Sequence, residues 1–83
     1  MNDEFAIIIN YKGQELNYPA KLLLQGFTHK FQVTLPETDV FFEPDEEGRY
    51  RVVKMPWQEE KVLLKIDKAL LAEIQQKIEE ILA

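Results

Sequence analysis

The feature that most constrains this chain is a two-residue alternation of apolar side chains between residues 5 and 55. A period of two is typical of β-strands that bury one face. Turn-forming residues interrupt the alternation at four places. The pattern predicts five strands, over residues 5–11, 15–24, 29–35, 40–43 and 49–55. Because the interruptions are short, successive strands should pair antiparallel as a meander.

Directly opposed residues of an antiparallel pair lie on the same face of the sheet, so the apolar residues also predict a register. The partners expected across the four hairpins are Tyr11 and Leu16, Leu24 and His29, Leu35 and Val40, and Phe42 and Tyr50. Pro19 conflicts with this scheme because it has no N–H to donate within a central strand. We therefore expect a bulge or a break in the second strand at Pro19.

After residue 66 the spacing of the apolar residues changes from two to the three and four residues that are typical of a helix. Asp67 can cap a helix over 67–82, whose apolar stripe would cover one face of the sheet. This stripe comprises Leu70, Leu71, Ile74, Ile78, Ile81 and Leu82. We expect residues 56–66 to form an extended connection, because Val62, Leu64 and Ile66 alternate. The alternative is a longer helix with Pro56 in its first turn, which Leu63 fits better.

The predicted fold is therefore α+β, an antiparallel five-stranded β-meander with one C-terminal α-helix packed on one face. We expect a single small domain over 1–83, with the sheet in 5–55, the connecting segment in 56–66 and the helix in 67–82.

Charge and composition narrow the function classes. Fifteen acidic residues against ten basic ones give a net charge of −5, which opposes binding to phosphate backbones and anionic membranes. The absence of cysteine favours a reducing compartment, so we expect a cytoplasmic protein. The acidic residues 1–4 do not resemble the start of a signal peptide. No apolar run approaches the ~18 residues of a membrane span.

The sequence carries little catalytic chemistry. It contains neither serine nor cysteine, which excludes Ser–His and Cys–His catalysis, so we expect no enzyme and no cofactor. The only histidine, His29, is expected to be a surface residue at a strand end. The run Asp45-Glu46-Glu47-Gly48 does not match the ligand spacing of a calcium loop. It is expected to form a solvated type I turn closed by a glycine bulge, with no metal.

The outer face, which is the sheet face turned away from the helix, is the candidate for binding. We expect a protein partner or a homodimer, through a face formed by Ile8, Leu23, Phe41, Arg51 and Val53. The alternative is single-stranded nucleic acid. In that case Lys21, Lys30, Arg49 and Arg51 would contact phosphates and Phe41 would stack on a base. Against this alternative stand the net charge and a cross-strand pair expected between Glu43 and Arg49. Trp57 is expected to pack on the core rather than to serve as an exposed contact.

Overall fold

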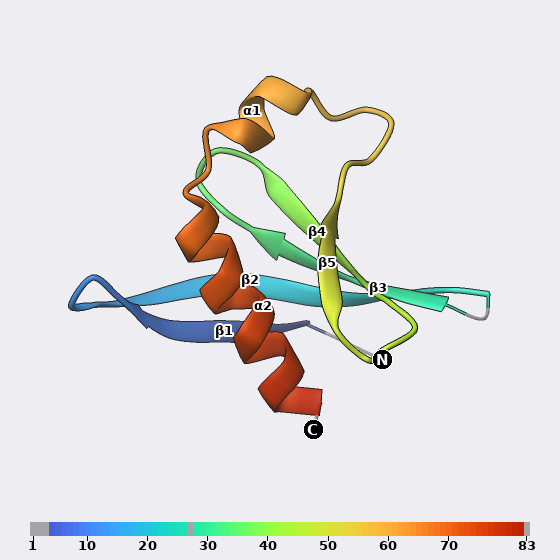
Figure 1. The fold of residues 1–83 in the computed structure, drawn as a ribbon, viewed down its shortest axis with the longest axis horizontal. Helices are drawn as coiled ribbons and strands as arrows, with labels where there is room; N and C mark the ends of the chain where they lie inside the picture. The colour runs from blue at the N-terminus through green and yellow to red at the C-terminus, as the bar shows by residue number, and fades with distance from the viewer. Residues whose placement is uncertain (1–3, 27, 83) are drawn as a thin grey trace.

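The computed structural model describes residues 4–26 and 28–82, and it confirms the α+β fold (Figure 1). The side chains of Gln25 and Leu82, like residues 1–3, 27 and 83, lie outside this description. The five strands are β1 (Glu4–Tyr11), β2 (Gln14–Gln25), β3 (Thr28–Thr34), β4 (Asp39–Pro44) and β5 (Tyr50–Val53). The helices are α1 (Glu60–Leu64) and α2 (Lys68–Leu82). The strands pair antiparallel in chain order, so β1 and β5 are the edges of the sheet.

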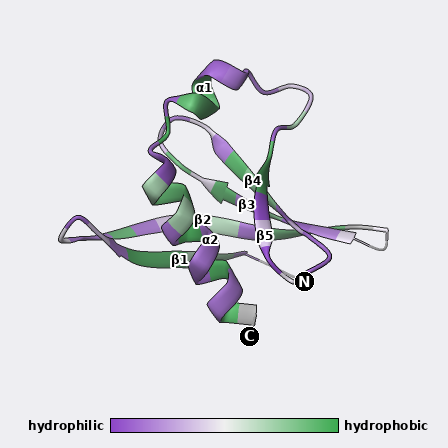
Figure 2. Cartoon of the chain, in the orientation of Figure 1, coloured by the Kyte–Doolittle hydropathy of each residue, from purple (hydrophilic) through white to green (hydrophobic). Residues whose placement is uncertain are grey.

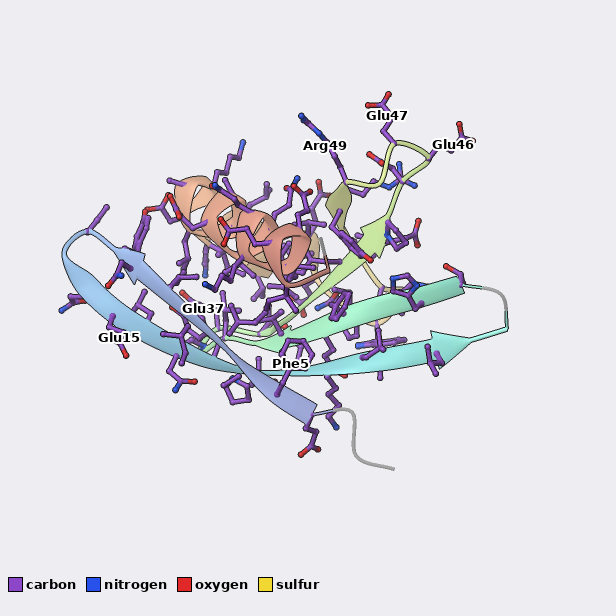
Figure 3. The ribbon with its side chains drawn as sticks, turned by 90° about the horizontal axis from the view of Figure 1, so that it is seen from below. Phe5, Glu15, Glu37, Glu46, Glu47 and Arg49 are labelled. Carbon is purple, nitrogen blue, oxygen red and sulfur yellow. The ribbon has the colours of Figure 1, made fainter. Side chains whose placement is uncertain are left out.

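The helix α2 lies across one face of the sheet and contacts both edge strands (Figure 1). The sheet twists, so that in Figure 3 β1, β2 and β3 pass below the helix while β4 and β5 rise at its side. The core fills the space between them and follows the alternation of the strands. Its buried members are Ile7, Ile9, Ala20, Phe31, Val33, Leu35, Val40, Phe42, Tyr50, Ile66, Ile74 and Ile78.

The apolar stripe of α2 is confirmed in its centre and is wrong at its end. Ile74 and Ile78 are buried, and Leu70 and Leu71 pack against the core. Ile81 is exposed instead, because α2 extends past the strands that it covers. Leu82 was also expected in this stripe, but its side chain lies outside the described part of the structure.

The register differs from the expected one by two residues in three of the four hairpins. Ile9 lies opposite Leu16, Val33 opposite Val40, and Phe42 opposite Val52. Only the β2–β3 register is confirmed, with Leu24 opposite His29. A slip of two residues leaves every side chain on the same face, so the apolar pattern cannot distinguish the two registers.

Pro19 does not interrupt β2, which contradicts the expected bulge or break. Lys12 and Gly13 form a two-residue turn, so the flanking Tyr11 and Gln14 exchange both backbone hydrogen bonds. Pairs alternate along the ladder, which puts Pro19 and Ala6 in a non-hydrogen-bonded pair. The nitrogen of Pro19 therefore faces away from β1, and the ladder with β3 begins only at Ala20. No ladder hydrogen bond is lost there.

The connecting segment is not extended throughout, because residues 60–64 form the short helix α1. Leu63 and Ile66 are three residues apart, so a helical turn directs both side chains toward the core. Ile66 is buried and Leu63 packs against the core, whereas Leu64 remains exposed. The burial of Leu63 and Ile66 therefore favours a helical turn, although the alternation of Val62, Leu64 and Ile66 predicts an extended segment.

Candidate interaction surface

The register brings four of the five predicted interaction residues together on the outer face. Phe41 lies opposite Val53 in one row of cross-strand neighbours, and Leu23 and Arg51 belong to the next row. Ile8 is on the same face but lies on β1, opposite Asn17. Two strands, β2 and β3, lie between β1 and β4, so Ile8 is not part of the same patch.

Phe41 is not available as an exposed contact, because only 4% of its surface is accessible to solvent. The indole of Trp57 lies edge-on to its ring, with 5.9 Å between centroids and 88° between planes. This is a favourable aromatic geometry. The loop of Trp57, whose sequence shows no hydrophobic period, thus covers Phe41, which the strand pattern places on the exposed outer face. Phe41 cannot serve as the stacking platform for a base.

Trp57 itself is not in the core, contrary to our expectation, and 69% of its surface is exposed. The neighbouring Gln58 holds the loop of Trp57 to the start of β4. Its side-chain oxygen accepts a hydrogen bond from the Met55 N–H (3.0 Å), and its Nε2 donates to the Asp39 carbonyl (2.6 Å). Trp57 is therefore exposed on a loop with a defined attachment, beside the patch of Phe41 and Val53.

The basic residues of the outer face are paired with carboxylates. The Glu43 carboxylate lies 3.1 Å from Nη2 of Arg51 and 3.7 Å from Nζ of Lys30. The expected partner of Glu43 was Arg49, and the two-residue slip in register replaces it by Arg51. Lys21 lies 3.9 Å from the Glu4 carboxylate. Arg49 belongs to the β4–β5 turn, where Figure 3 shows it directed away from the sheet.

The acidic β4–β5 turn has the predicted geometry. The Asp45 N–H donates to the Arg49 carbonyl (2.7 Å), and Gly48 has the positive φ of +83° that a glycine bulge requires. Oδ1 of Asp45 accepts hydrogen bonds from the N–H groups of Glu47 and Arg49. The carboxylate of Asp45 thus stabilises the turn itself. Within residues 4–26 and 28–82, no three metal-ligating side chains cluster.

His29 is half-buried rather than a surface residue, and it belongs to an aromatic group on the inner face. Its Nε2 lies 2.6 Å from the Tyr50 hydroxyl, and its ring packs edge-on against Phe31. Burial, and secondarily the nearby Glu79, raise the pKa of Tyr50. No spacing in the sequence indicates this contact, because the register of three strands determines it. The pair fixes the end of β3 against β5.

No helix in the described part of the chain is long and apolar enough to cross a membrane. Comparison of the sequence with family models and with curated proteins, and of the fold with solved structures, finds no match. The function must therefore be argued from the geometry of the surface.

Proposed function

We propose that this chain is a small non-enzymatic domain that acts through protein–protein contacts on its outer face. The observation that carries the proposal is the exposed indole of Trp57, which Gln58 holds in place beside Phe41. Tryptophan is enriched among the residues that dominate binding energy at protein interfaces. An indole already fixed in position loses little conformational entropy when a partner binds.

The surroundings of Trp57 support a protein partner. The half-buried Val53 extends the apolar surface, and the row of Lys30, Glu43 and Arg51 borders it with paired charges. An apolar centre with a polar rim is the usual composition of such interfaces. The absence of serine and cysteine from the sequence is consistent with a role in binding rather than in catalysis.

Single-stranded nucleic acid is the weaker candidate. Lys30 and Arg51 already face Glu43. Lys21 faces Glu4 and Phe41 is covered, so four of the five expected nucleic-acid contacts are engaged within the chain. The net charge of −5 adds long-range repulsion. Trp57 could still stack on a base, so an experiment must separate the two candidates.

The experiment uses Trp57→Ala with Leu64→Ala as its control, since Leu64 is also a largely exposed apolar residue. A protein captured on the immobilised chain is purified, and its affinity is then measured by calorimetry for the wild type and both variants. Trp57→Ala should weaken binding by about 30-fold or more, as for an interface hot spot, and Leu64→Ala should have little effect.

The proposal is overturned if the purified protein binds both variants as tightly as the wild type. A single-stranded oligonucleotide is titrated in parallel, with the fluorescence of Trp57 as the signal. Binding that weakens as salt increases, and that is lost in Trp57→Ala, would assign the outer face to nucleic acid instead.

A further inference from the structure

The two edges of the sheet differ in how they are protected. β1 presents eight residues, and it contains neither a charged residue nor a proline between Phe5 and Tyr11. Figure 2 shows this strand as largely hydrophobic. Natural edge strands normally carry lysine, proline, bulges or a covering segment, because an unprotected edge pairs with other chains. In the described part of the chain, β1 has a charge only at its first residue, Glu4, and shows none of these devices between Phe5 and Tyr11.

The other edge, β5, has several of them. It is only four residues long and includes Arg51, with Arg49 and Lys54 directly beside it. Glu79 of α2 accepts a hydrogen bond from the Tyr50 N–H at 2.9 Å, which covers the start of the strand. The chain therefore blocks pairing at β5 and leaves β1 open to it.

The backbone groups available at the β1 edge follow from the two-residue turn. Tyr11 exchanges its backbone hydrogen bonds with Gln14, so the odd-numbered residues of β1 direct their N–H and C=O groups toward β2. Ala6, Ile8 and Asn10 direct their N–H and C=O groups away from β2, where no described strand pairs with them. A hollow of about 210 Å³ lies beside this edge, between Ile8 and Asn10 of β1 and Glu73 and Lys77 of α2. The hollow leaves space between α2 and the backbone of this edge.

We propose that a second copy of this chain pairs antiparallel with β1, about a two-fold axis at Ile8, to form a continuous ten-stranded sheet. In this register Ile8 meets Ile8 of the second copy, Ile7 meets its Ile9, and Phe5 meets its Tyr11. Ile7 and Ile9 are already buried within their own chain, so the new apolar contact comes from Ile8 and from Phe5 with Tyr11, while Ala6 meets Asn10. Self-complementarity of this kind is what an isologous contact requires, and it favours the chain itself over a foreign strand.

The charges are compatible with this pairing. The register brings Glu4 near Lys12 in the turn of the second copy, so charges of opposite sign lie at each end of the paired segment, although within each chain they already face Lys21 and Asp67. The segment between them is uncharged, although each chain carries a net charge of −5. Salt screens the overall repulsion between the two chains, so self-association should strengthen as ionic strength rises. Binding to an oligonucleotide would respond in the opposite direction.

This contact uses a surface separate from the patch at Trp57, so either proposal can fail without the other. The first measurement is sedimentation equilibrium of the wild type, of Ile8→Lys and of Leu64→Lys. Ile8 and Leu64 are both exposed, at 46% and 64%, and only Ile8 lies on β1. We expect a wild-type dimer. In Ile8→Lys two lysines would meet at the axis, so association should weaken by about tenfold or more. Leu64→Lys should remain a dimer.

The second measurement is amide hydrogen exchange of the wild type at concentrations above and below its dissociation constant. The N–H groups of Ala6, Ile8 and Asn10 should be protected only in the dimer. Those of Ile7 and Ile9 should be protected at both concentrations, because β2 accepts them, and they serve as internal controls.

A wild type that stays monomeric up to about 1 mM overturns the proposal. So does a dimer in which the amides of Ala6, Ile8 and Asn10 remain unprotected, since its interface would lie elsewhere. The proposal is also overturned if Ile8→Lys associates as strongly as the wild type. A change in the Trp57 experiment alone leaves this inference intact.

Discussion

The Tyr11 hydroxyl, at the end of β1, donates a hydrogen bond to Asp67, the residue that caps α2. The same carboxylate accepts a hydrogen bond from the Ala69 N–H (2.9 Å) and lies 3.6 Å from Nζ of Lys12. One side chain thus joins the first hairpin to the start of the helix. The hydrogen bond from Tyr11 is the largest cause that lowers the pKa of Asp67. The same bond raises the pKa of Tyr11 to about 12.

The first prediction concerns stability at alkaline pH. Tyr11 holds its proton more tightly in the folded chain, with a pKa near 12 against 10.0 in the unfolded chain. The contribution of the Tyr11 hydroxyl to the stability of the fold is therefore complete below pH 10 and is lost as the pH rises through about 12. Thermal unfolding across this range should show the melting temperature of the wild type falling toward that of Tyr11→Phe, because the variant lacks the ionisable hydroxyl.

Asp67 supplies the matching test in acid. Its pKa is lowered in the folded chain, so its contribution is complete above the unfolded value of 3.8 and is lost as the pH falls below it. Asp67→Asn should be less stable than the wild type at neutral pH and should approach it in acid. A constant difference between the two proteins at all pH values would contradict the assigned contact.

The second prediction concerns Lys12, which has a positive φ of +51° in the turn that it forms with Gly13. A left-handed conformation costs an ordinary L-residue about 1–2 kcal/mol, whereas asparagine is favoured at this position of the turn. The pair of Lys12 with Asp67 is exposed to solvent, so it offsets only part of that cost. Lys12→Asn should therefore stabilise the chain slightly, by about 0.5 kcal/mol, in denaturant unfolding.

Gly13→Ala is the control for that conformational argument. Gly13 has φ +78°, and a Cβ at this position would meet no atom within 4 Å, so the substitution tests backbone strain alone. It should cost about 1 kcal/mol. If Lys12→Asn is clearly destabilising while Gly13→Ala behaves as expected, the pair between Lys12 and Asp67 is stronger than its exposure suggests.

The strand faces were predictable from the sequence because the period of two assigns each side chain to one face. The register was not predictable in the same way. Leu16 and Tyr18 lie on the same face, so Ile9 can pair with either. The length of the turn at Lys12 and Gly13 decides between them, and a four-residue turn gives an equally apolar face.

The candidate site was predictable only in part. The alternation placed Phe41 and Val53 correctly on the outer face. The burial of Phe41 depends on Trp57, which belongs to a loop without periodicity. The attachment of that loop depends on a hydrogen bond from Gln58 to the Asp39 carbonyl, between residues far apart in the sequence. Tertiary contacts of this kind leave no local pattern.

The third prediction concerns the core beneath α2. Ile74 is fully buried and belongs to the core. Ile74→Ala should cost about 2–5 kcal/mol, because it removes buried methyl groups and leaves a cavity. Ile81→Ala is the matched control on the same helix, since Ile81 is exposed, and it should cost much less. Denaturant unfolding in which both variants lose under about 1 kcal/mol would contradict the packing of α2 on the sheet.

The last prediction concerns the acidic β4–β5 turn, where Asp45 accepts two backbone hydrogen bonds and Glu46 and Glu47 are exposed. Asp45→Ala should cost about 1 kcal/mol or more, because two N–H groups lose their acceptor, and Glu46→Ala should be nearly neutral. Asp45→Asn retains an acceptor oxygen and should recover part of the loss. A structural carboxylate of this kind needs no ion, so millimolar calcium or magnesium should leave the melting temperature of the wild type unchanged. A cation at 100 times its dissociation constant would add about 2.7 kcal/mol, so an upward shift with either ion would contradict this assignment.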